Sequence, residues 1–183
     1  MSDLGIAYIG PTSLTEKNLP SIMASLDSPP DKVACDTETV SIKDRTCIGI
    51  GMALGPKEAI YFRNLPDVSP YIDHLSHALC SSKVLKIYHN ALFDLGVLTI
   101  IGSMIGWPSI DMTNIADTSV IARVQGLEAA LGTLAFSVLG MDIPTYEATV
   151  PPRSNSLDVH WSAMAEKCLQ DCLATYRLYE KIY

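Results

Sequence analysis

The chain lacks an excess of positive charge, and this limits what its surface as a whole can bind. Its 13 lysine and arginine residues are outnumbered by 20 aspartate and glutamate residues, and the formal net charge is −7. A broad basic face for duplex nucleic acid is therefore excluded. A narrow site for one phosphate remains compatible with this charge, because bound metal ions can supply positive charge locally.

Long apolar runs and a leader segment are also missing. The sequence contains no stretch of about 18 apolar residues, the length that a membrane-spanning helix needs, and no basic segment followed by an apolar run at its N-terminus. We therefore expect an intracellular protein without a membrane partner.

Cysteine pairs with metal-binding spacing are absent as well. The five cysteines include no Cys-x-x-Cys pair, and Cys168 and Cys172 have no histidine at zinc spacing. We expect buried, free, structural thiols in a reducing compartment.

The composition that is present suits one folded domain with a substantial core. The chain has 183 residues, of which 48% are hydrophobic and only 18% are charged. We predict an N-terminal arm over residues 1–32 and a domain over residues 33–183. In the arm, residues 6–9 favour a short strand, and Ser13 with Glu16 fits a capping box for a short helix.

The apolar pattern of the domain predicts an α/β fold: a mixed sheet, first an antiparallel meander and then parallel strands, flanked by helices. Strands are predicted over residues 33–36, 47–54, 58–62 and 84–88, with a short strand or turn over 111–117. Helices are predicted over residues 68–80, 119–124, 127–139 and 162–183, and a further helix is predicted to begin after Asn90. Asn90 is the expected N-cap of that helix, and Asp117 is the expected cap of the helix 119–124.

Two other features stand outside this pattern. Residues 143–156 are predicted to form a loop, and loops of that length are usually functional or mobile. His74 and His77 are three residues apart on a predicted helix, but without a third ligand nearby they are interpreted as surface residues. The chain stops within a helical pattern, so we expect it to be part of something longer.

Two carboxylates lie at the end of the first strand of the meander. Asp36 and Glu38 are two residues apart, and alternate residues of a strand point to the same face. Two acids that face together repel each other unless a cation lies between them. Oxygen ligands of this kind suit magnesium or manganese better than zinc, although the pair alone is also typical of a solvated strand end.

Two more acids occupy positions where such a site can be completed. Asp94 follows the strand 84–88 at the start of a helix, a junction where α/β folds place ligands. Asp171 lies in the last predicted helix.

The four acids and their neighbours resemble the motifs of the DEDD 3′–5′ exonucleases, which have the ribonuclease H-like fold. The likeness is greatest to the proofreading domain of A-family DNA polymerases, with ribonuclease D as a more distant relative. It covers about residues 33–183. The first family motif is matched by Asp36-Thr37-Glu38-Thr39, the second by Asn90-Ala91-Leu92-Phe93-Asp94, and the third by Asp171 only.

The resemblance implies two Mg²⁺ or Mn²⁺ ions that clamp a scissile phosphate and activate water. By analogy, Asp36 would contact both ions, Glu38 and Asp171 would complete one, and Asp94 would hold the other.

The implied partner is the 3′ end of a single-stranded nucleic acid, with DNA expected ahead of RNA, and a polymerase domain in the same or a partner chain. Thr37 is expected to contact the terminal nucleotide. Asn90 and Phe93 are expected to flank the strand, although Phe93 suits the core equally well.

The last motif departs from both branches of the family. In one branch a tyrosine lies four residues before the final aspartate, where this chain has Lys167. In the other, a histidine lies five residues before it, where this chain has Glu166. One helical turn separates Lys167 from Asp171, so Lys167 is a candidate catalytic residue that assists the site, a lysine that impairs it, or a silent surface residue. His160 is a candidate substitute base.

Three functions follow as hypotheses. The first is a metal-dependent 3′–5′ exonuclease acting on single-stranded DNA, potentially in proofreading. The second is a catalytically weakened module of the same fold that binds nucleic acid or has a structural role. The third is an RNA-trimming enzyme like ribonuclease D, because the sequence does not distinguish between the two sugars.

Overall fold

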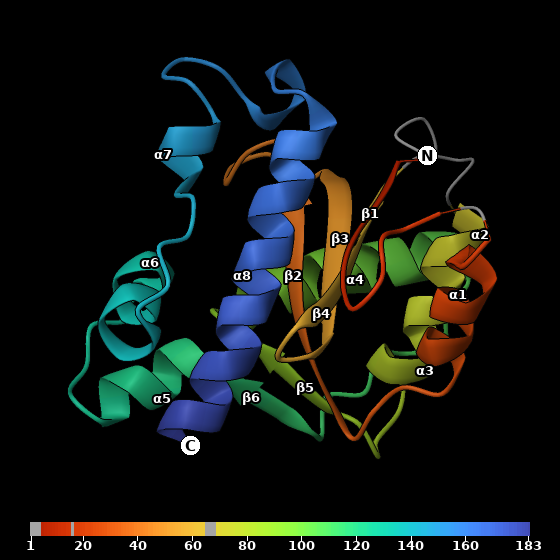
Figure 1. Cartoon of the computed structure of the whole chain (residues 1–183), viewed down its shortest axis with the longest axis horizontal. Helices are drawn as coiled ribbons and strands as arrows, with labels where there is room; N and C mark the ends of the chain where they lie inside the picture. The colour runs from red at the N-terminus through yellow and green to blue at the C-terminus, as the bar shows by residue number, and fades with distance from the viewer. Residues whose placement is uncertain (1–4, 16, 65–68) are drawn as a thin grey trace.

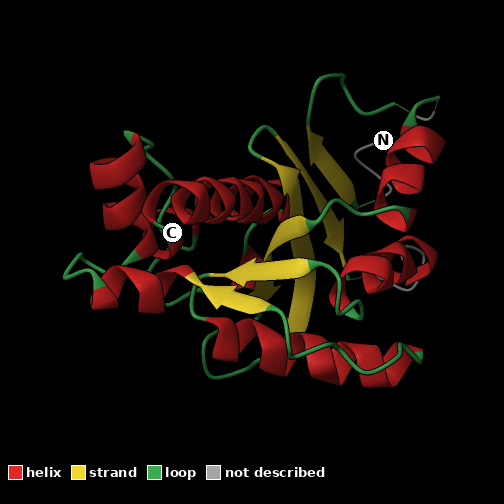
Figure 2. Ribbon diagram, turned by 90° about the horizontal axis from the view of Figure 1, so that it is seen from below, coloured by secondary structure: helices red, strands yellow, loops and turns green. Residues whose placement is uncertain are grey.

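The computed structural model describes residues 5–15, 17–64 and 69–183. A mixed sheet of six strands in the order β1-β4-β3-β2-β5-β6 forms its centre (Figure 1). Helices cover both faces of this sheet, as the view along its edge shows (Figure 2). The predicted α/β class is therefore confirmed.

The antiparallel half of the sheet is the meander that the apolar alternation predicted. It consists of β2 (Lys32–Thr39), β3 (Cys47–Gly55) and β4 (Glu58–Arg63). The two parallel strands β5 (Leu85–Tyr88) and β6 (Ile115–Asp117) extend it beyond β2. The C-terminal ends of β2, β5 and β6 therefore lie along the same edge of the sheet, where α/β folds bind ligands.

One long helix covers one face of the sheet, and several shorter helices cover the other. The long helix is α8 (Trp161–Ile182), which packs on β2, β3 and β4. The opposite face is covered by α1 (Leu19–Asp27), α3 (Ser76–Leu79) and α4 (Ala91–Ile105). The sheet thus has an apolar core on each side.

Small residues let α8 approach the sheet closely. A Cβ atom on Gly51 of β3 would lie 2.6 Å from Sγ of Cys168 and 2.8 Å from Sγ of Cys172. Because real Cβ contacts are not that short, glycine is required for this distance between helix and sheet. All five cysteines, which lie in the described ranges, are free, as predicted; four of them are buried, whereas Cys80 is only half-buried.

The arm and the first helical region differ in detail from the prediction. The strand predicted at residues 6–9 is β1 (Ile6–Ile9), which pairs with β4 at the sheet edge. The capping box lies outside the described residues, because it needs Glu16. The predicted helix 68–80 also begins outside them, and its described part is divided into α2 (Ser69–Ile72), a 3-10 turn η3 (Asp73–Leu75) and α3.

The apolar side of α1 is buried in the core that α3 and α4 share. The described part of the predicted arm therefore packs against the domain, while the division at residue 32 remains a prediction.

Two predictions for the region before α8 are wrong. The helix predicted from residue 127 begins only at α6 (Leu131–Leu134) and continues as a π-helical turn η4 (Ala135–Leu139). The preceding backbone is held outside the helix by a tertiary contact, because the carbonyl oxygen of Ala129 lies 2.7 Å from Nε2 of His89. The predicted loop 143–156 contains a helical turn, α7 (Tyr146–Thr149), whose N-terminus Thr145 caps.

The remaining short helices are α5 (Thr118–Val124), which Asp117 caps as predicted, and the 3-10 turn η5 (Ser156–Asp158). None of the helices in the described ranges is both long and apolar enough to cross a membrane.

Candidate active site

Strand β2 sends its alternate side chains to the two sides of the sheet, and this arrangement organises the site. Ala34 belongs to the core beneath α8, and Asp36 and Glu38 follow it at two-residue intervals on that face. Val33 and Cys35 belong to the opposite core, and Thr37 follows them on the side of α4. The predicted common face of Asp36 and Glu38 is therefore present.

Thr37 joins the strand to the first turn of α4. Its backbone N–H and its hydroxyl both donate to Oδ1 of Asp94, at 2.9 Å and 2.7 Å. Both residues are buried. A carboxylate in the first helical turn is further stabilised by the amide dipoles. Asp94 is thus fixed beside the two acids of β2.

Asp117 fixes the position of α4 from the neighbouring strand. Its carboxylate accepts hydrogen bonds from the N–H groups of Asn90 and Ala91, at 3.1 Å and 2.8 Å, and also from those of Ser119 and Val120 at the start of α5. Asn90 occupies the N-cap position of α4, as predicted, but its side chain makes no capping hydrogen bond. Asn90 instead has φ 74°, a conformation that asparagine tolerates well.

Lys167 occupies the position between two of the acids. Its Nζ donates to Oε1 of Glu38 at 3.0 Å and to Oδ2 of Asp171 at 2.7 Å. Only 11% of the lysine side chain is exposed. Lys167 is therefore not a surface residue that points to solvent. Two of the three hypotheses for it remain, namely that it assists the site or that it impairs it.

The charges of this cluster are strongly coupled because one ammonium faces several carboxylates. Burial opposes the charge of Lys167, but Glu38, Asp36 and Asp171 outweigh it and raise the pKa of the ammonium above its usual range. Burial raises the pKa of Asp36 and of Asp171 to about 7 in each case, although Lys167 opposes the rise. Burial also raises the pKa values of Glu38 and Asp94. One positive charge does not neutralise the cluster.

A hard cation fits the acid that Lys167 does not contact. Oδ2 of Asp36 is buried and has no hydrogen-bond partner among the described residues. Ligand atoms of Asp36, Glu38 and Cys168 lie within 4.8 Å of one another. Burial raises the pKa of the Cys168 thiol well above its usual range, so the sulfur remains a poor ligand at neutral pH. The carboxylate oxygens are the donors that suit Mg²⁺ or Mn²⁺.

These side chains line a cleft of about 200 Å³. Seven of the eight predicted site residues line it. The eighth, Asp171, does not line it but accepts a hydrogen bond from Lys167, which does. Phe93 packs partly against the core. The guanidinium group of Arg45 lies over its ring, 5.0 Å from the ring centre. The seven are Asp36, Thr37, Glu38, Asn90, Phe93, Asp94 and Lys167.

Four cleft residues were not among the predicted site residues, and one of them, Thr39, belongs to the motif matched at the end of β2. Tyr146 comes from the segment that was predicted as a functional or mobile loop, and that loop length was the signal that pointed to it. Ile42 lies in the turn after β2 and is 75% exposed. His89 precedes Asn90, and both of its ring nitrogens are hydrogen-bonded, to Thr118 and to the carbonyl of Ala129.

The proposed substitute base is not part of the cleft. His160 caps the N-terminus of α8, and its Nδ1 lies 2.8 Å from Oγ of Ser162. It is not among the residues that line the cleft.

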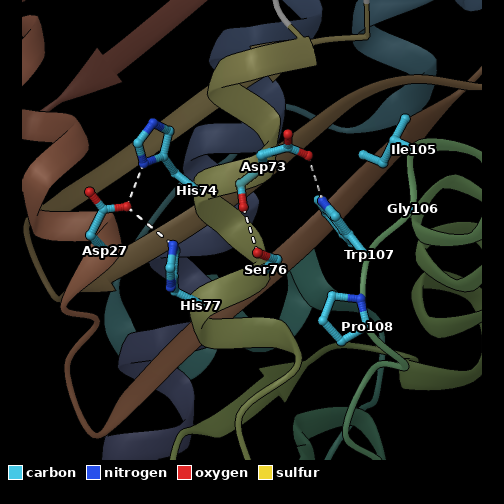
Figure 3. Close-up of a pocket in the computed structure, with 9 residues that line it drawn as sticks. All are labelled: Asp27, Asp73, His74, Ser76, His77, Ile105, Gly106, Trp107 and Pro108. Carbon is cyan, nitrogen blue, oxygen red and sulfur yellow. Dashed lines mark hydrogen bonds and ion pairs between the residues drawn. The ribbon is translucent and has the colours of Figure 1, made fainter.

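A larger pocket lies at the other end of α4, between α3 and the segment Ile105–Pro108 (Figure 3). There Asp27 of α1 contacts the rings of His74 and His77, so an acidic partner for the two histidines does exist. Among the described residues, however, only Asp36, Glu38 and Cys168 bring three ligand atoms together. The histidines are therefore interpreted as surface residues that contact Asp27.

Comparison with known proteins places these observations in a family. A family model described as 3′-5′ exonuclease matches residues 12–183. No curated protein matches the chain in sequence.

Solved structures of low sequence identity share the fold. Ribonuclease D of Trypanosoma brucei has a TM-score of 0.67 at 14% identity, with 92% of this chain and 62% of that chain covered. NrnC of Brucella melitensis has a TM-score of 0.59 at 20% identity, with coverage of 83% and 71%. The POL domain of Pol1 from M. smegmatis, in complex with DNA primer-template and dNTP, has a TM-score of 0.59 at 13% identity, with coverage of 92% and 26%.

Proposed function

Because the chain belongs to the 3′-5′ exonuclease family, we propose that it hydrolyses phosphodiester bonds at the 3′ ends of single-stranded nucleic acids in a metal-dependent reaction. We propose DNA as its substrate. A role in proofreading, beside a polymerase domain, is part of the same proposal.

The convergence of four acids from three separate elements carries this proposal. Asp36 and Glu38 come from β2, Asp94 from α4 and Asp171 from α8. Buried carboxylates that repel one another are costly unless a cation compensates them. A purely structural site has no need for such a cluster.

The acids of the cleft and Thr37 have separate roles in the proposed reaction. Asp36, Glu38 and Asp94 would hold Mg²⁺ or Mn²⁺, with Asp171 behind them. When bound, the metal supplies positive charge for the phosphate and lowers the pKa of a water molecule. Thr37 keeps the Asp94 carboxylate in place through its two hydrogen bonds.

The proposed substrate contacts come from the walls of the cleft. Asn90 and Phe93 lie on one wall, at the start of α4, where they would flank the terminal nucleotide. Thr37 is expected to contact the same nucleotide. An aromatic face can stack on any base, which suits a strand that is degraded irrespective of its sequence.

A degradation assay tests the proposal. A 5′-labelled single-stranded DNA oligonucleotide is incubated with the protein and Mg²⁺ or Mn²⁺, and the wild type is expected to shorten it one nucleotide at a time. Asp36→Asn removes the charge of the central acid with little change in shape, and should abolish shortening. Asp31→Asn, at an exposed acid where β2 begins, is the matched control. Equal behaviour of wild type and Asp36→Asn would refute the proposal.

RNA is the alternative substrate. One structural neighbour, ribonuclease D of Trypanosoma brucei, was solved in complex with RNA U12, whereas the M. smegmatis structure contains DNA. Oligonucleotides of the same sequence with deoxyribose and ribose sugars separate the two, because only the second offers a 2′-hydroxyl contact. Faster shortening of the RNA than of the DNA would show that RNA, and not the proposed DNA, is the preferred substrate.

The ion pairs of Lys167 favour a second candidate, a weakened exonuclease module that binds nucleic acid with little turnover. The lysine occupies two carboxylates that a metal-dependent reaction needs. Saturable binding of the oligonucleotide without shortening in either metal would favour this candidate over the first.

A further inference from the structure

The position of Lys167 determines how many ions the acidic cluster can hold. Its Nζ lies 3.0 Å from Oε1 of Glu38 and 2.7 Å from Oδ2 of Asp171, with both carboxylates buried. These are the distances of charge-assisted hydrogen bonds. The ammonium therefore bridges one acid from β2 and one from α8.

A divalent ion on the same two carboxylates would compete with this ammonium. Mg²⁺ binds oxygen at about 2.0–2.1 Å and demands near-octahedral geometry, so it needs these oxygens turned toward itself. A second cation beside the ammonium would also be repelled by it at short range, in a buried site with little screening. Oε1 of Glu38 and Oδ2 of Asp171 cannot together bind a second ion while both accept hydrogen bonds from the lysine.

The environment of Asp36 differs from that of these two acids. Its Oδ2 is buried without a hydrogen-bond partner among the described residues, and no ion pair occupies it. One carboxylate oxygen of Glu38 lies within 4.8 Å of a carboxylate oxygen of Asp36. Asp94 contributes a further carboxylate to the same cleft. One position for a hard cation therefore remains in the cluster.

We infer that Lys167 is a resident cation that takes the place of one of two divalent ions, so that the site binds a single Mg²⁺ or Mn²⁺ through Asp36. This inference rests on the proposed function for its choice of metal and of site. It turns the two-ion arrangement that the family resemblance implies into an arrangement of one ion and one ammonium.

Counting bound ions tests the inference without any substrate. Mn²⁺ is titrated into the metal-free full chain, and bound ions are counted by calorimetry and by the loss of the free Mn²⁺ signal in electron paramagnetic resonance. The wild type is expected to bind one ion. Lys167→Met removes the ammonium but keeps an unbranched side chain of similar length, and should bind two. Lys167→Arg retains the charge and should bind one.

Lys181→Met is the matched control, because Lys181 is an exposed lysine near the end of the same helix and should leave the count at one. Asp36→Asn should remove the single ion of the wild type. Two ions in the wild type would overturn the inference, and so would a wild type that binds none at millimolar Mn²⁺. An unchanged count of one in Lys167→Met would overturn it as well.

The test remains decisive if Lys167→Met does not fold, because the counts for wild type and Lys167→Arg do not depend on that variant. It is also distinct from the test of the proposed function. A wild type that binds one ion through Asp36 but degrades no oligonucleotide supports the inference and refutes the proposed activity. A wild type that degrades DNA with two bound ions does the reverse.

Discussion

The ammonium of Lys167 lies 2.7 Å from Oδ2 of Asp171, one turn further along the same helix. Pairs at this spacing on an exposed helix contribute only a few tenths of a kcal/mol. Here the pair is buried and extends to Glu38 on β2, so it connects α8 to the sheet at the site. The lysine thus connects the last helix to the sheet beside the cleft.

Removal of this lysine should destabilise the metal-free protein. Lys167→Met leaves Glu38 and Asp171 buried without their counter-charge, and breaking a buried pair typically costs about 3–5 kcal/mol. Urea denaturation in EDTA at pH 7.5 measures the change in the free energy of unfolding. Lys181→Met should change it by less than about 0.5 kcal/mol, as exposed substitutions usually do. A loss equally small for Lys167→Met would contradict the buried pair.

The stability of the metal-free protein should fall as the pH rises from about 4 to about 7. Burial raises the pKa values of Asp36 and Asp171 to about 7, from 3.8 in the unfolded chain. Across this window the folded state binds more protons than the unfolded state, so the free energy of unfolding decreases and then levels off. Denaturation in EDTA at several pH values measures this decrease.

Other acids also titrate in this range, so the comparison uses a variant. Asp36→Asn removes one of the titrating groups and should make the decrease smaller than in the wild type. An identical pH profile for Asp36→Asn would show that Asp36 has an ordinary pKa in the folded state.

The carboxylate of Asp117 should be essential for the start of two helices. Asp117→Ala removes the acceptor for N–H groups at the beginning of both α4 and α5, and each lost cap costs about 0.5–2 kcal/mol. The combined loss is expected to be about 2 kcal/mol in urea denaturation. Asp117→Asn keeps an oxygen acceptor and should lose less. A larger loss for asparagine than for alanine would contradict the capping role.

The hydroxyl of Thr37 should matter more for activity than for folding. Thr37→Val removes one of its two hydrogen bonds to Asp94 but retains shape and the backbone N–H bond. We expect about a tenfold loss of the shortening rate, equivalent to about 1.4 kcal/mol of transition-state stabilisation. Thr37→Ser retains the hydroxyl and should keep most of the rate. Single-turnover shortening of the labelled oligonucleotide measures both, and equal rates for valine and serine would contradict the role of the hydroxyl.

The close approach of α8 to β3 should not tolerate a side chain at Gly51. Gly51→Ala places a Cβ atom 2.6 Å from Sγ of Cys168, and overpacking of this kind typically costs about 1–3 kcal/mol. Gly55→Ala, on the same strand with no atom within 4 Å of the new Cβ, is the control. Thermal denaturation should show a loss for Gly51→Ala only. Equal melting temperatures for the two variants would contradict the tight packing.

Features that depend on neighbouring residues were predictable from the sequence. The alternation along β2 placed Asp36 and Glu38 on one face, and the position of Asp117 before α5 predicted its cap. The antiparallel meander followed from short connections between apolar segments. In each case the determining contacts are between residues close in the chain, so the local pattern contains the information.

Features that depend on contacts between distant segments were not predictable in this way. The start of α6 was missed because the preceding backbone binds His89, 40 residues earlier. Asn90 occupies the predicted N-cap position of α4, but the side chain that accepts hydrogen bonds there is that of Asp117, 27 residues later in the chain. Helix propensity cannot show either contact, since both are created only when the elements pack together.

The sequence by itself determined that four acids occur in an order typical of one nuclease family, and that two of them share a face of a strand. Only the tertiary structure decided which groups Lys167 contacts, because its partner Glu38 lies 129 residues away and is brought to it by the packing of α8 on the sheet. A lysine in an amphipathic helix has the same local pattern whether it faces solvent or a buried carboxylate. Its role therefore depends on which surface the helix packs against.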